Sequence, residues 1–397
     1  MLPDIRSQTA EELGAQCRSW GQPTYRVAQL LEWLYAHRAS NWEAMTNLPK
    51  TLRDQLRKHY SLTSLELVRR QGAPDTTEKF LWRLSDGALI ESVLIPANPA
   101  LYGEPSDRHT LCVSTQVGCA YGCKFCASGL AGWKRNLRAE EIVEQVLAVE
   151  RWNENESKVH SLESKVRDAE RGGAPDFELR TSDFGLPSLN PQPRLVSNLV
   201  VMGMGEPLAN YENLLRALKI LNAPWGGGIG ARKITISTSG LAPQIRRLAD
   251  EPLQFRLAIS LHGATDATRN KLMPVNRKYP LGELTAACEY YQRQKGRMIT
   301  FEYVLIAGVN DARQEAQALA VLARRFHAKV NLIAYNRVEG LPWERPGEAV
   351  QEAFLKTLLK QKVSATLRRE KGSEIDAACG QLRLKTEQEL TRPQTTG

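Results

Sequence analysis

Three cysteines, Cys119, Cys123 and Cys126, lie close together at the spacing C-x3-C-x2-C, within the stretch "TQVGCAYGCKFCASG". Thiolates grouped in this way typically bind zinc or an iron–sulfur cluster. Structural zinc usually takes four protein ligands, often from two C-x2-C pairs, and the sequence holds no second pair. Three cysteines leave one coordination position open, which suits an iron–sulfur cube that also binds a small molecule. A zinc site and a trio of inert buried cysteines are the alternatives.

The cysteines follow the first of six β-rich segments that alternate with helical ones. The β-rich segments cover residues 110–115, 198–205, 233–240, 255–263, 299–308 and 329–336. Helical periodicity lies between them, as in 139–152 and 211–221, and such alternation predicts βαβ units and a parallel sheet. Six units are too few for a closed eight-stranded barrel. The expected fold class is therefore α/β, with a partial (β/α)6 barrel at its centre.

Polar and glycine residues follow several of these β-rich segments. They form the motifs "GMGEP" (203–207), "STSG" (237–240), "SLHG" (260–263) and "AYN" (334–336). Because the carboxyl ends of parallel strands meet at one edge of a sheet, we expect these motifs to line one site. A dinucleotide-binding loop is a weaker interpretation of "GMG", since the full G-x-G-x-x-G pattern is absent.

Other regions surround or interrupt this repeat. We expect a helical accessory domain in residues 1–75, a β-hairpin linker in 76–104, a core in 105–370 and a C-terminal segment in 371–397. Helical periodicity spans 9–59, with a basic second helix that suits either packing or RNA binding, and "SDG" (85–87) supplies the hairpin turn. Residues 153–194 are charged and then rich in Pro, Gly and Ser, which predicts a mobile insertion. Residues 362–370 predict one further strand.

The composition indicates an apolar core and a basic surface. Of 397 residues, 42% are hydrophobic, and the net charge is +9 with a pI near 9.2. This excess of Lys and Arg favours a polyanionic partner such as nucleic acid, although a generally basic protein would have the same composition. No apolar stretch is long enough to span a membrane, and no signal peptide is visible. Seven cysteines without a secretion signal favour a reducing, cytoplasmic setting.

Five motifs together carry a resemblance to a known family. They are "TLCVSTQVGCAYGCKFCASG" (110–129), "VVMGMGEPLANYENLLRAL" (200–218), "ISTSG" (236–240), "AISLHGATDATRNKLMPVN" (258–276) and "EIDAACGQLR" (374–383). Over roughly residues 20–385, apart from the insertion, the chain resembles the RlmN family of radical S-adenosylmethionine (SAM) methyltransferases, which is similar in outline to the Cfr resistance methyltransferases. The resemblance implies methylation of adenine C2 in the peptidyl-transferase region of 23S ribosomal RNA, and of an adenosine beside the anticodon in some transfer RNAs.

The resemblance also implies a cofactor and a ligand for the expected site. Cys119, Cys123 and Cys126 would hold a [4Fe–4S] cluster whose unligated iron binds the amino and carboxylate groups of SAM. An electron from an external flavodoxin- or ferredoxin-like donor would cleave SAM to a 5'-deoxyadenosyl radical, so that the cofactor supplies the difficult chemistry. The implied SAM contacts are Gly205, Glu206, Ser237, Ser260, Leu261, His262 and Asn336.

Three further residues match reactive groups of the family. Cys379, in "DAACGQ", corresponds to the cysteine that one SAM molecule methylates, that gives up a hydrogen atom to the radical from a second, and that is briefly bonded to the RNA. Cys112 corresponds to the cysteine that attacks the Cys379 sulfur, forms a transient disulfide and releases the product. Glu91 corresponds to the general base, a role for which burial would prepare a carboxylate. Cys17 and Cys288 are interpreted as small buried apolar residues.

Two other functions stay open on the sequence alone. A Cfr-like enzyme would use the same residues to methylate adenine C8 instead of C2. A zinc-dependent protein that binds RNA without catalysis would use the cysteine cluster as a structural site. Mapping the methylated atom distinguishes the first, and iron and sulfide analysis of anaerobically purified protein distinguishes the second.

Overall fold

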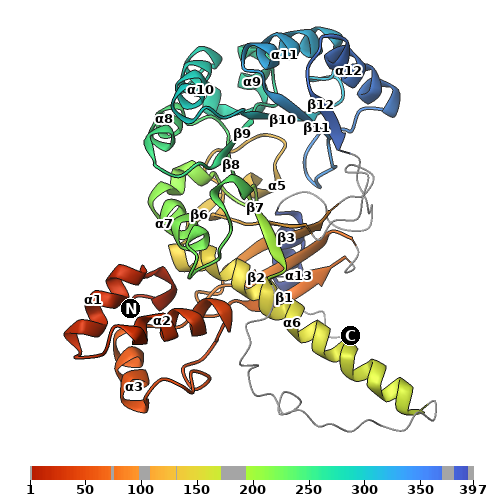
Figure 1. The fold of residues 1–397 in the computed structure, drawn as a ribbon. Helices are drawn as coiled ribbons and strands as arrows, with labels where there is room; N and C mark the ends of the chain where they lie inside the picture. The colour runs from red at the N-terminus through yellow and green to blue at the C-terminus, as the bar shows by residue number, and fades with distance from the viewer. Residues whose placement is uncertain are drawn as a thin grey trace. The chain divides into compact units, whose positions relative to one another are not determined.

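The computed structural model describes residues 2–72, 76–97, 108–130, 132–170, 194–368 and 380–391. The chain divides into two compact units (Figure 1). The first unit comprises Met1–Leu65, Arg138–Ser197 and Leu215–Ile229, and the second comprises Glu66–Leu137, Asn198–Leu214 and Gly230–Gly397.

The second unit is built on a ten-stranded sheet in the order β1-β2-β3-β4-β7-β8-β9-β10-β11-β12. Its strands are β1 (Glu66–Gln71), β2 (Glu78–Arg83), β3 (Leu89–Pro96), β4 (His109–Cys112), β7 (Val196–Val201), β8 (Ile234–Thr238), β9 (Arg256–Ser260), β10 (Thr300–Leu305), β11 (Lys329–Ala334) and β12 (Ala365–Arg368). Neighbouring strands from β7 to β12 run parallel. Strands β1 to β4 pair antiparallel and extend the same sheet.

The predicted fold class is confirmed. All six β-rich segments contain a strand of this sheet, and the further strand expected in 362–370 is β12. The central strands are apolar along their length because both faces are covered, as in β9, where Leu257, Ala258 and Ile259 are all buried. Helices follow the strands in the alternating order of βαβ units: α7 (Tyr211–Asn222), α8 (Ala242–Asp250), α9 (Asp266–Leu272), α10 (Leu281–Lys295), α11 (Arg313–Arg325) and α12 (Glu348–Lys360).

The antiparallel part of the sheet places Lys79, Glu91 and Cys112 on the same face. Opposite residues in an antiparallel pair point to the same side, and the register pairs Leu81 with Glu91, Lys79 with Val93, and Val93 with Cys112. Helix α13 (Gln381–Thr391) covers this face, since its Leu382 packs in a buried cluster with Leu81 and Leu89. The C-terminal helix therefore lies against the hairpin β2–β3.

A small ribbon that the sequence did not reveal surrounds the cysteine cluster. Strands β5 (Gln116–Gly118) and β6 (Trp133–Asn136) pair antiparallel, and the short helix α5 (Ala127–Leu130) lies between them. The ribbon follows β4 directly, so the cysteines lie in a closed loop rather than in an open connection.

The first unit is helical. Its helices are α1 (Ala10–Ser19), α2 (Tyr25–Leu31), α3 (Lys50–His59) and α6 (Ala139–Glu170). Helix α3 begins directly after Pro49. Two buried ion pairs join the N-terminal residues to α6 within this unit, Arg6 with Glu144 at 2.5 Å and Arg38 with Glu150 at 3.2 Å.

Three features differ in detail from the expected organisation. Strand β1 lies inside the range 1–75 that was expected to be helical, and the hairpin expected as a linker belongs to the sheet. Helix α6 continues to Glu170, well past the start of the expected insertion at 153, and the remainder of that insertion to 193 lies outside the described residues. The domain boundaries themselves stay a prediction. Among the described residues, no helix combines the length and apolar character needed to cross a membrane.

Candidate active site

The cysteine loop is held by the β5–β6 ribbon. Cys119, Cys123 and Cys126 lie between β5 and the start of α5 and are all partly exposed. The Cys119 backbone N–H donates to the Gly132 carbonyl oxygen at 3.2 Å. Gly118 has φ +77°, and a Cβ there would lie 1.9 Å from that carbonyl oxygen, so the close crossing of the two strands requires glycine.

Burial disfavours the thiolate form of two of these cysteines, Cys119 and Cys123. Burial raises the pKa of Cys119 to about 11, with smaller contributions from Cys126 and Glu206. Burial also raises the pKa of Cys123 well above its ordinary value. A bound metal group would reverse this balance, because it favours the deprotonated thiol. The donor chemistry fits an iron–sulfur cluster, but no three His, Cys, Asp or Glu side chains in the described ranges converge on one metal position, and ligation by these cysteines stays a prediction.

Glu206 is a buried carboxylate that organises the ends of β7 and β8. Its Oε2 accepts a hydrogen bond from Ser239 N at 2.7 Å, and its Oε1 accepts one from Leu208 N at 3.1 Å. Gly205 before it has φ +102°, and a Cβ would lie 2.6 Å from the Cβ of Gln116. Burial raises the pKa of Glu206. A positive ligand group, such as an ammonium, would therefore stabilise the charged carboxylate.

The strand ends and the cysteine loop meet at His262. The hydroxyl oxygens of Ser237 and Ser260, near the ends of β8 and β9, lie 3.1 Å apart. Phe125, which precedes the third cysteine, packs edge-on against the His262 ring with centroids 4.8 Å apart. Asn336 is half-buried in the loop that follows β11. The structure therefore places Phe125 of the cysteine loop against His262, just after the end of β9.

His262 is held as a neutral ring. It is buried with φ +52°, and its Nδ1 accepts a hydrogen bond from Val304 N at 3.1 Å. Burial lowers the pKa of His262 to about 3, with a smaller contribution from Arg269. The ring therefore carries its proton on Nε2 at neutral pH and can donate one hydrogen bond from that atom.

Arg269, which the sequence analysis did not single out, fastens the strand ends together. Its buried guanidinium donates to the carbonyl oxygens of Ser239 at 3.0 Å, Ser260 at 3.3 Å and Leu261, and to Asn276 Oδ1 at 2.8 Å. Burial lowers its pKa to about 10. The residue lies inside one of the five motifs, but an arginine in the short helix α9 resembles an ordinary surface residue by its pattern.

Glu91 lies where β3, α5 and the start of α13 meet. Its side chain is 3% exposed. The Glu91 Oε2 accepts a hydrogen bond from Gly380 N at 2.9 Å, and Oε1 accepts one from Arg383 N at 2.7 Å. Gly380 also touches α5, since a Cβ there would lie 2.8 Å from Ser128 Oγ. Cys379 lies outside the described residues, but it is bonded directly to Gly380 in the chain.

Cys112 ends β4 and is 6% exposed. The strand register puts it on the face of the sheet that carries Glu91. The described residues thus bring Glu91, Cys112 and the residue after Cys379 to one face of the sheet, although their chemical roles stay predictions.

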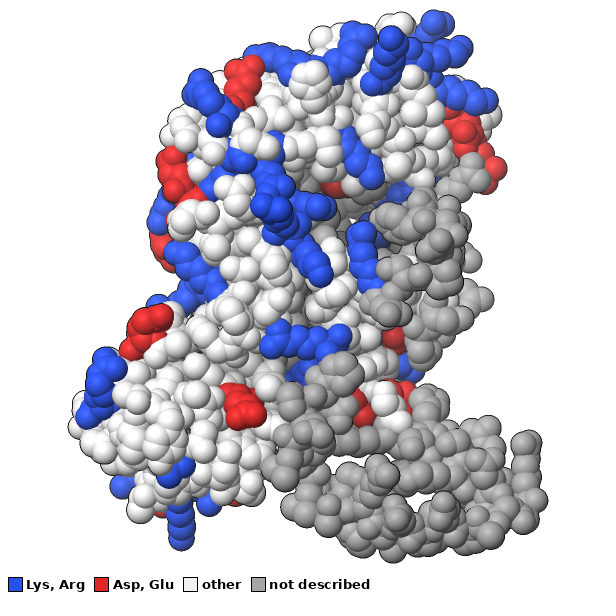
Figure 2. Space-filling model, viewed as in Figure 1, with Lys and Arg blue, Asp and Glu red and all other residues white. Residues whose placement is uncertain are grey.

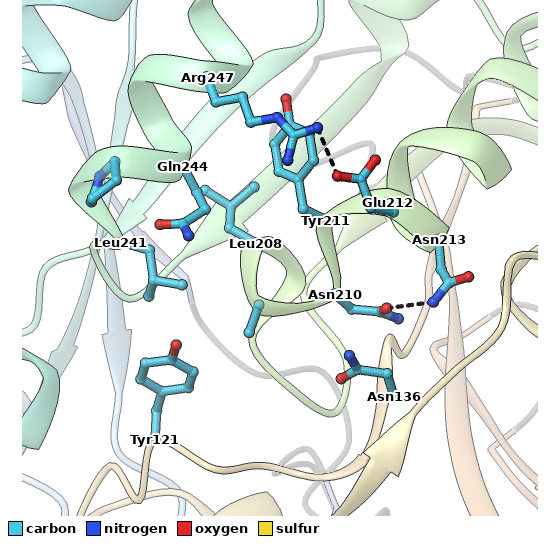
Figure 3. Close-up of a pocket in the computed structure, with 12 residues that line it drawn as sticks. Tyr121, Asn136, Leu208, Asn210, Tyr211, Glu212, Asn213, Leu241, Gln244 and Arg247 are labelled. Atoms are coloured by element: carbon cyan, nitrogen blue, oxygen red, sulfur yellow. Dashed lines mark hydrogen bonds and ion pairs between the residues drawn. The ribbon is translucent and has the colours of Figure 1, made fainter.

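A cavity of about 490 Å³ opens beside the cysteine loop (Figure 3). Tyr121, which lies between two of the cysteines, forms one wall, and apolar and amide side chains line the rest: Asn136, Leu208, Asn213, Leu241 and Gln244. At the far end, Arg247 stacks over the Tyr211 ring at 4.1 Å and pairs with Glu212 at 2.7 Å. Aromatic, amide and guanidinium groups are the kinds of side chain that contact nucleotides.

Comparison with known proteins first gives the class. Residues 193–320 match the radical SAM superfamily, and residues 4–62 match the ribosomal RNA large subunit methyltransferase N-terminal domain. The fold is similar to that of a radical SAM methyltransferase from Sphaerobacter thermophilus, with a TM-score of 0.79, 42% sequence identity, and coverage of 96% of this chain and 98% of that one. The partial barrel and the cysteine loop therefore define a radical SAM enzyme, a class that uses a [4Fe–4S] cluster and SAM.

Two relatives give the family. The chain is 51% identical to the probable dual-specificity RNA methyltransferase RlmN 3 of Opitutus terrae, over 98% of this chain and 96% of the relative. It is 42% identical to the dual-specificity RNA methyltransferase RlmN of Anaeromyxobacter dehalogenans, over 96% and 91% of the two chains. The chain belongs to the RlmN family of dual-specificity RNA methyltransferases, and the resemblance carried by the five motifs is confirmed.

Proposed function

We propose that this enzyme methylates carbon C2 of an adenine in 23S ribosomal RNA and of an adenosine beside the anticodon of transfer RNA, by way of an S-methylated Cys379. The observation that supports this most directly is the pair of hydrogen bonds from the Gly380 and Arg383 backbone to Glu91. They bring the neighbour of Cys379 against a buried carboxylate, on the sheet face that Cys112 shares. A carrier thiol, a carboxylate and a second thiol are the protein groups that this route needs.

Cys379 is needed because adenine C2 is an electrophilic carbon that does not take a methyl group by displacement from a sulfonium. A thiolate does, so Cys379 is methylated first. When bound, the cluster and SAM supply a 5'-deoxyadenosyl radical that activates this S-methyl group. The radical would take one hydrogen atom from the S-methyl group, and the remaining methylene carbon would bond to adenine C2, which tethers the RNA to Cys379. The adduct would then lose one electron, which the cluster would take back, and the C2 proton, which Glu91 would accept.

Cys112 releases the product. Its thiolate attacks the Cys379 sulfur, the carbon–sulfur bond breaks with its electron pair going to the methylated base, and the base takes up a proton. The sulfurs are left as a Cys112–Cys379 disulfide. A cellular dithiol must reduce this disulfide before the next turnover.

The cofactor residues proposed from the motifs fit the site chemistry. Cys119, Cys123 and Cys126 would hold the cluster, and an external flavodoxin- or ferredoxin-like protein would deliver the electron. The SAM contacts would be Gly205, Glu206, Ser237, Ser260, Leu261, His262 and Asn336. The raised pKa of Glu206 supports contact with a positive group such as the methionine ammonium.

Two surface features support RNA binding. The cavity beside Tyr121 combines a ring for stacking with amides for base edges, and Arg247 can contact a phosphate. On the face drawn in Figure 2, Lys and Arg outnumber Asp and Glu over the region where Figure 1 shows α8 to α12. The net charge of +9 acts in the same direction. We propose that the enzyme works in the cytoplasm, where its RNA substrates are found.

Mass spectrometry of ribosomal and transfer RNA from cells with and without the gene tests the proposal. We expect 2-methyladenine at one position in each kind of RNA, present only when the gene is present. Methylation at C8 would support a Cfr-like enzyme instead. Zinc without iron and sulfide in protein purified anaerobically would contradict the whole mechanism.

A further inference from the structure

We propose that Lys79 and Glu91 form a buried latch that fixes the N-terminus of α13, the segment directly after Cys379 in the chain, against α5. In this Lys79–Glu91 latch, Lys79 is a positioning residue that acts through Glu91. The inference rests on the proposed role of Cys379 as methyl carrier, but the contacts of the latch are independent of that role.

The first part of the latch is the grip of Glu91 on the helix. The first backbone N–H groups of a helix have no partner within the helix. Glu91 lies on strand β3, and each of its carboxylate oxygens accepts a hydrogen bond from one of these N–H groups: Gly380 N at 2.9 Å and Arg383 N at 2.7 Å. A carboxylate at this end of a helix is also favoured by the helix dipole. The two carboxylate oxygens of Glu91 therefore fix the start of α13.

The second part is the ammonium of Lys79. Its Nζ lies 3.3 Å from Glu91 Oε2, and the two side chains are 2% and 3% exposed. Removing one member of a buried ion pair leaves an uncompensated charge, which is strongly unfavourable. Lys79 therefore lies where its ammonium can compensate the Glu91 carboxylate, whose two oxygens accept the backbone hydrogen bonds of α13.

The third part is the contact with α5. Gly380 donates a hydrogen bond to Glu91 and also packs closely against Ser128. A Cβ added at Gly380 would lie 3.1 Å from the Cα and the backbone N of Ser128. Helix α5 begins at Ala127, directly after Cys126. The latch thus fixes the chain next to Cys379 between the hairpin and the loop that would carry the cluster.

Two variants test the latch. Lys79→Met removes the charge and keeps most of the side-chain volume. Glu91→Gln keeps the shape, but an amide offers one acceptor oxygen to two N–H donors. Arg83→Met is the matched control, because Arg83 lies on the same strand in an ion pair with Glu66 at 3.3 Å, with side chains 40% and 62% exposed.

The primary measurement is hydrogen exchange of the anaerobically purified holoenzyme. Exchange of the amides in 380–384 should rise about tenfold to a hundredfold in Lys79→Met and Glu91→Gln, the factor expected for losing hydrogen bonds to a charged group. Amides of β7 to β11 should keep their protection. The S-methylated fraction of Cys379 and kcat should each fall about tenfold or more, while KM for RNA stays constant. Arg83→Met should change none of these quantities.

The outcomes separate the latch from the proposed function. Unchanged exchange of 380–384 in both variants would overturn the latch, whatever happens to activity. Loss of protection across the whole sheet would overturn it too, because the pair would then be a general folding element. Wild-type protein with normal protection of 380–384 but no S-methylated Cys379 during turnover would overturn the proposed function and leave the latch standing.

Discussion

Gly380→Ala is a sharp perturbation of the segment next to Cys379. Gly380 has φ +83°, a left-handed conformation that costs alanine roughly 1–2 kcal/mol. In addition, an added Cβ would lie 2.8 Å from Ser128 Oγ and 3.1 Å from the Ser128 Cα and N. The hydroxyl can rotate away, but the backbone atoms of α5 cannot, so the start of α13 must move.

The expected magnitude follows from these two costs. Moving the start of α13 lengthens its hydrogen bonds to Glu91, and a hydrogen bond to a charged group contributes about 1.5–3 kcal/mol. Together with the backbone strain, we expect Gly380→Ala to weaken docking of the first turn by ~2.5–5 kcal/mol, a factor of about 60 to 4,000 in the docked population. Methylation of Cys379 should fall by a similar factor, because the sulfur is seldom in position.

Gly340→Ala isolates the contact from the strain. Gly340 has the same φ of +83°, but no atom lies within 4 Å of its would-be Cβ. Both variants should lose a similar amount of stability from the backbone alone, measured by denaturant unfolding, whereas only Gly380→Ala should lose S-methylation of Cys379, measured by mass spectrometry of the protein. Equal S-methylation in the two variants would refute the idea that close packing against Ser128 positions the carrier.

Three further outcomes are expected. Cys112→Ala should accumulate protein joined to RNA through Cys379, seen as a denaturant-resistant and nuclease-sensitive band; normal turnover would show that another group resolves the adduct. Arg247→Ala should raise KM for an RNA fragment about tenfold, the effect expected for the loss of one phosphate contact at moderate salt. Arg325→Ala is the control, because it breaks a similarly exposed ion pair at 2.6 Å and should leave KM unchanged. Equal KM values for the two variants would argue against RNA binding at the cavity. Burial lowers the pKa of His262 to about 3 in the folded protein, whereas a histidine in the unfolded chain has a pKa near 6.5. Below about pH 6.5 the unfolded chain therefore binds a proton that folded His262 does not bind, and the free energy of unfolding should decline as the pH falls from about 6.5 toward 3. Denaturant unfolding of His262→Gln from pH 4 to pH 8 should lack this decline in the free energy of unfolding. The same pH dependence in the variant and the wild type would contradict the assignment of the decline to His262.

The parallel half of the fold could be predicted because its signals are local. Residues 255–263 form an apolar run that ends in a polar motif, and the structure turns this run into a covered strand whose end faces the cysteine loop. The same holds for β7 and β8, which end at the motifs that contain Glu206 and Ser237. Hydrophobic continuity and the position of polar residues were sufficient there.

The remainder depends on contacts between distant parts of the chain. The hairpin looked like a linker because its pairing with β4, Val93 opposite Cys112, leaves no pattern in either segment. Arg269 looked like a surface residue because the backbone carbonyl groups that it binds belong to two other segments, one at Ser239 and one at Ser260 and Leu261. Glu91 was singled out only through the family motif, and its contact with α13 could not have been inferred from periodicity.

The bonds from Glu91 to Gly380 and Arg383 join residues 289 and 292 positions apart in the sequence. Closing so long a loop carries a large entropic cost, and contacts of high sequence separation form late in folding. The parallel ladders lie within that loop and do not depend on it. A folding chain should therefore complete its sheet before the start of α13 docks on it. The same separation allows this short segment to open and close again without unfolding any strand. That freedom would suit the proposed role of the neighbouring Cys379, whose sulfur would have three successive partners: a methyl donor, an RNA base and a second thiol.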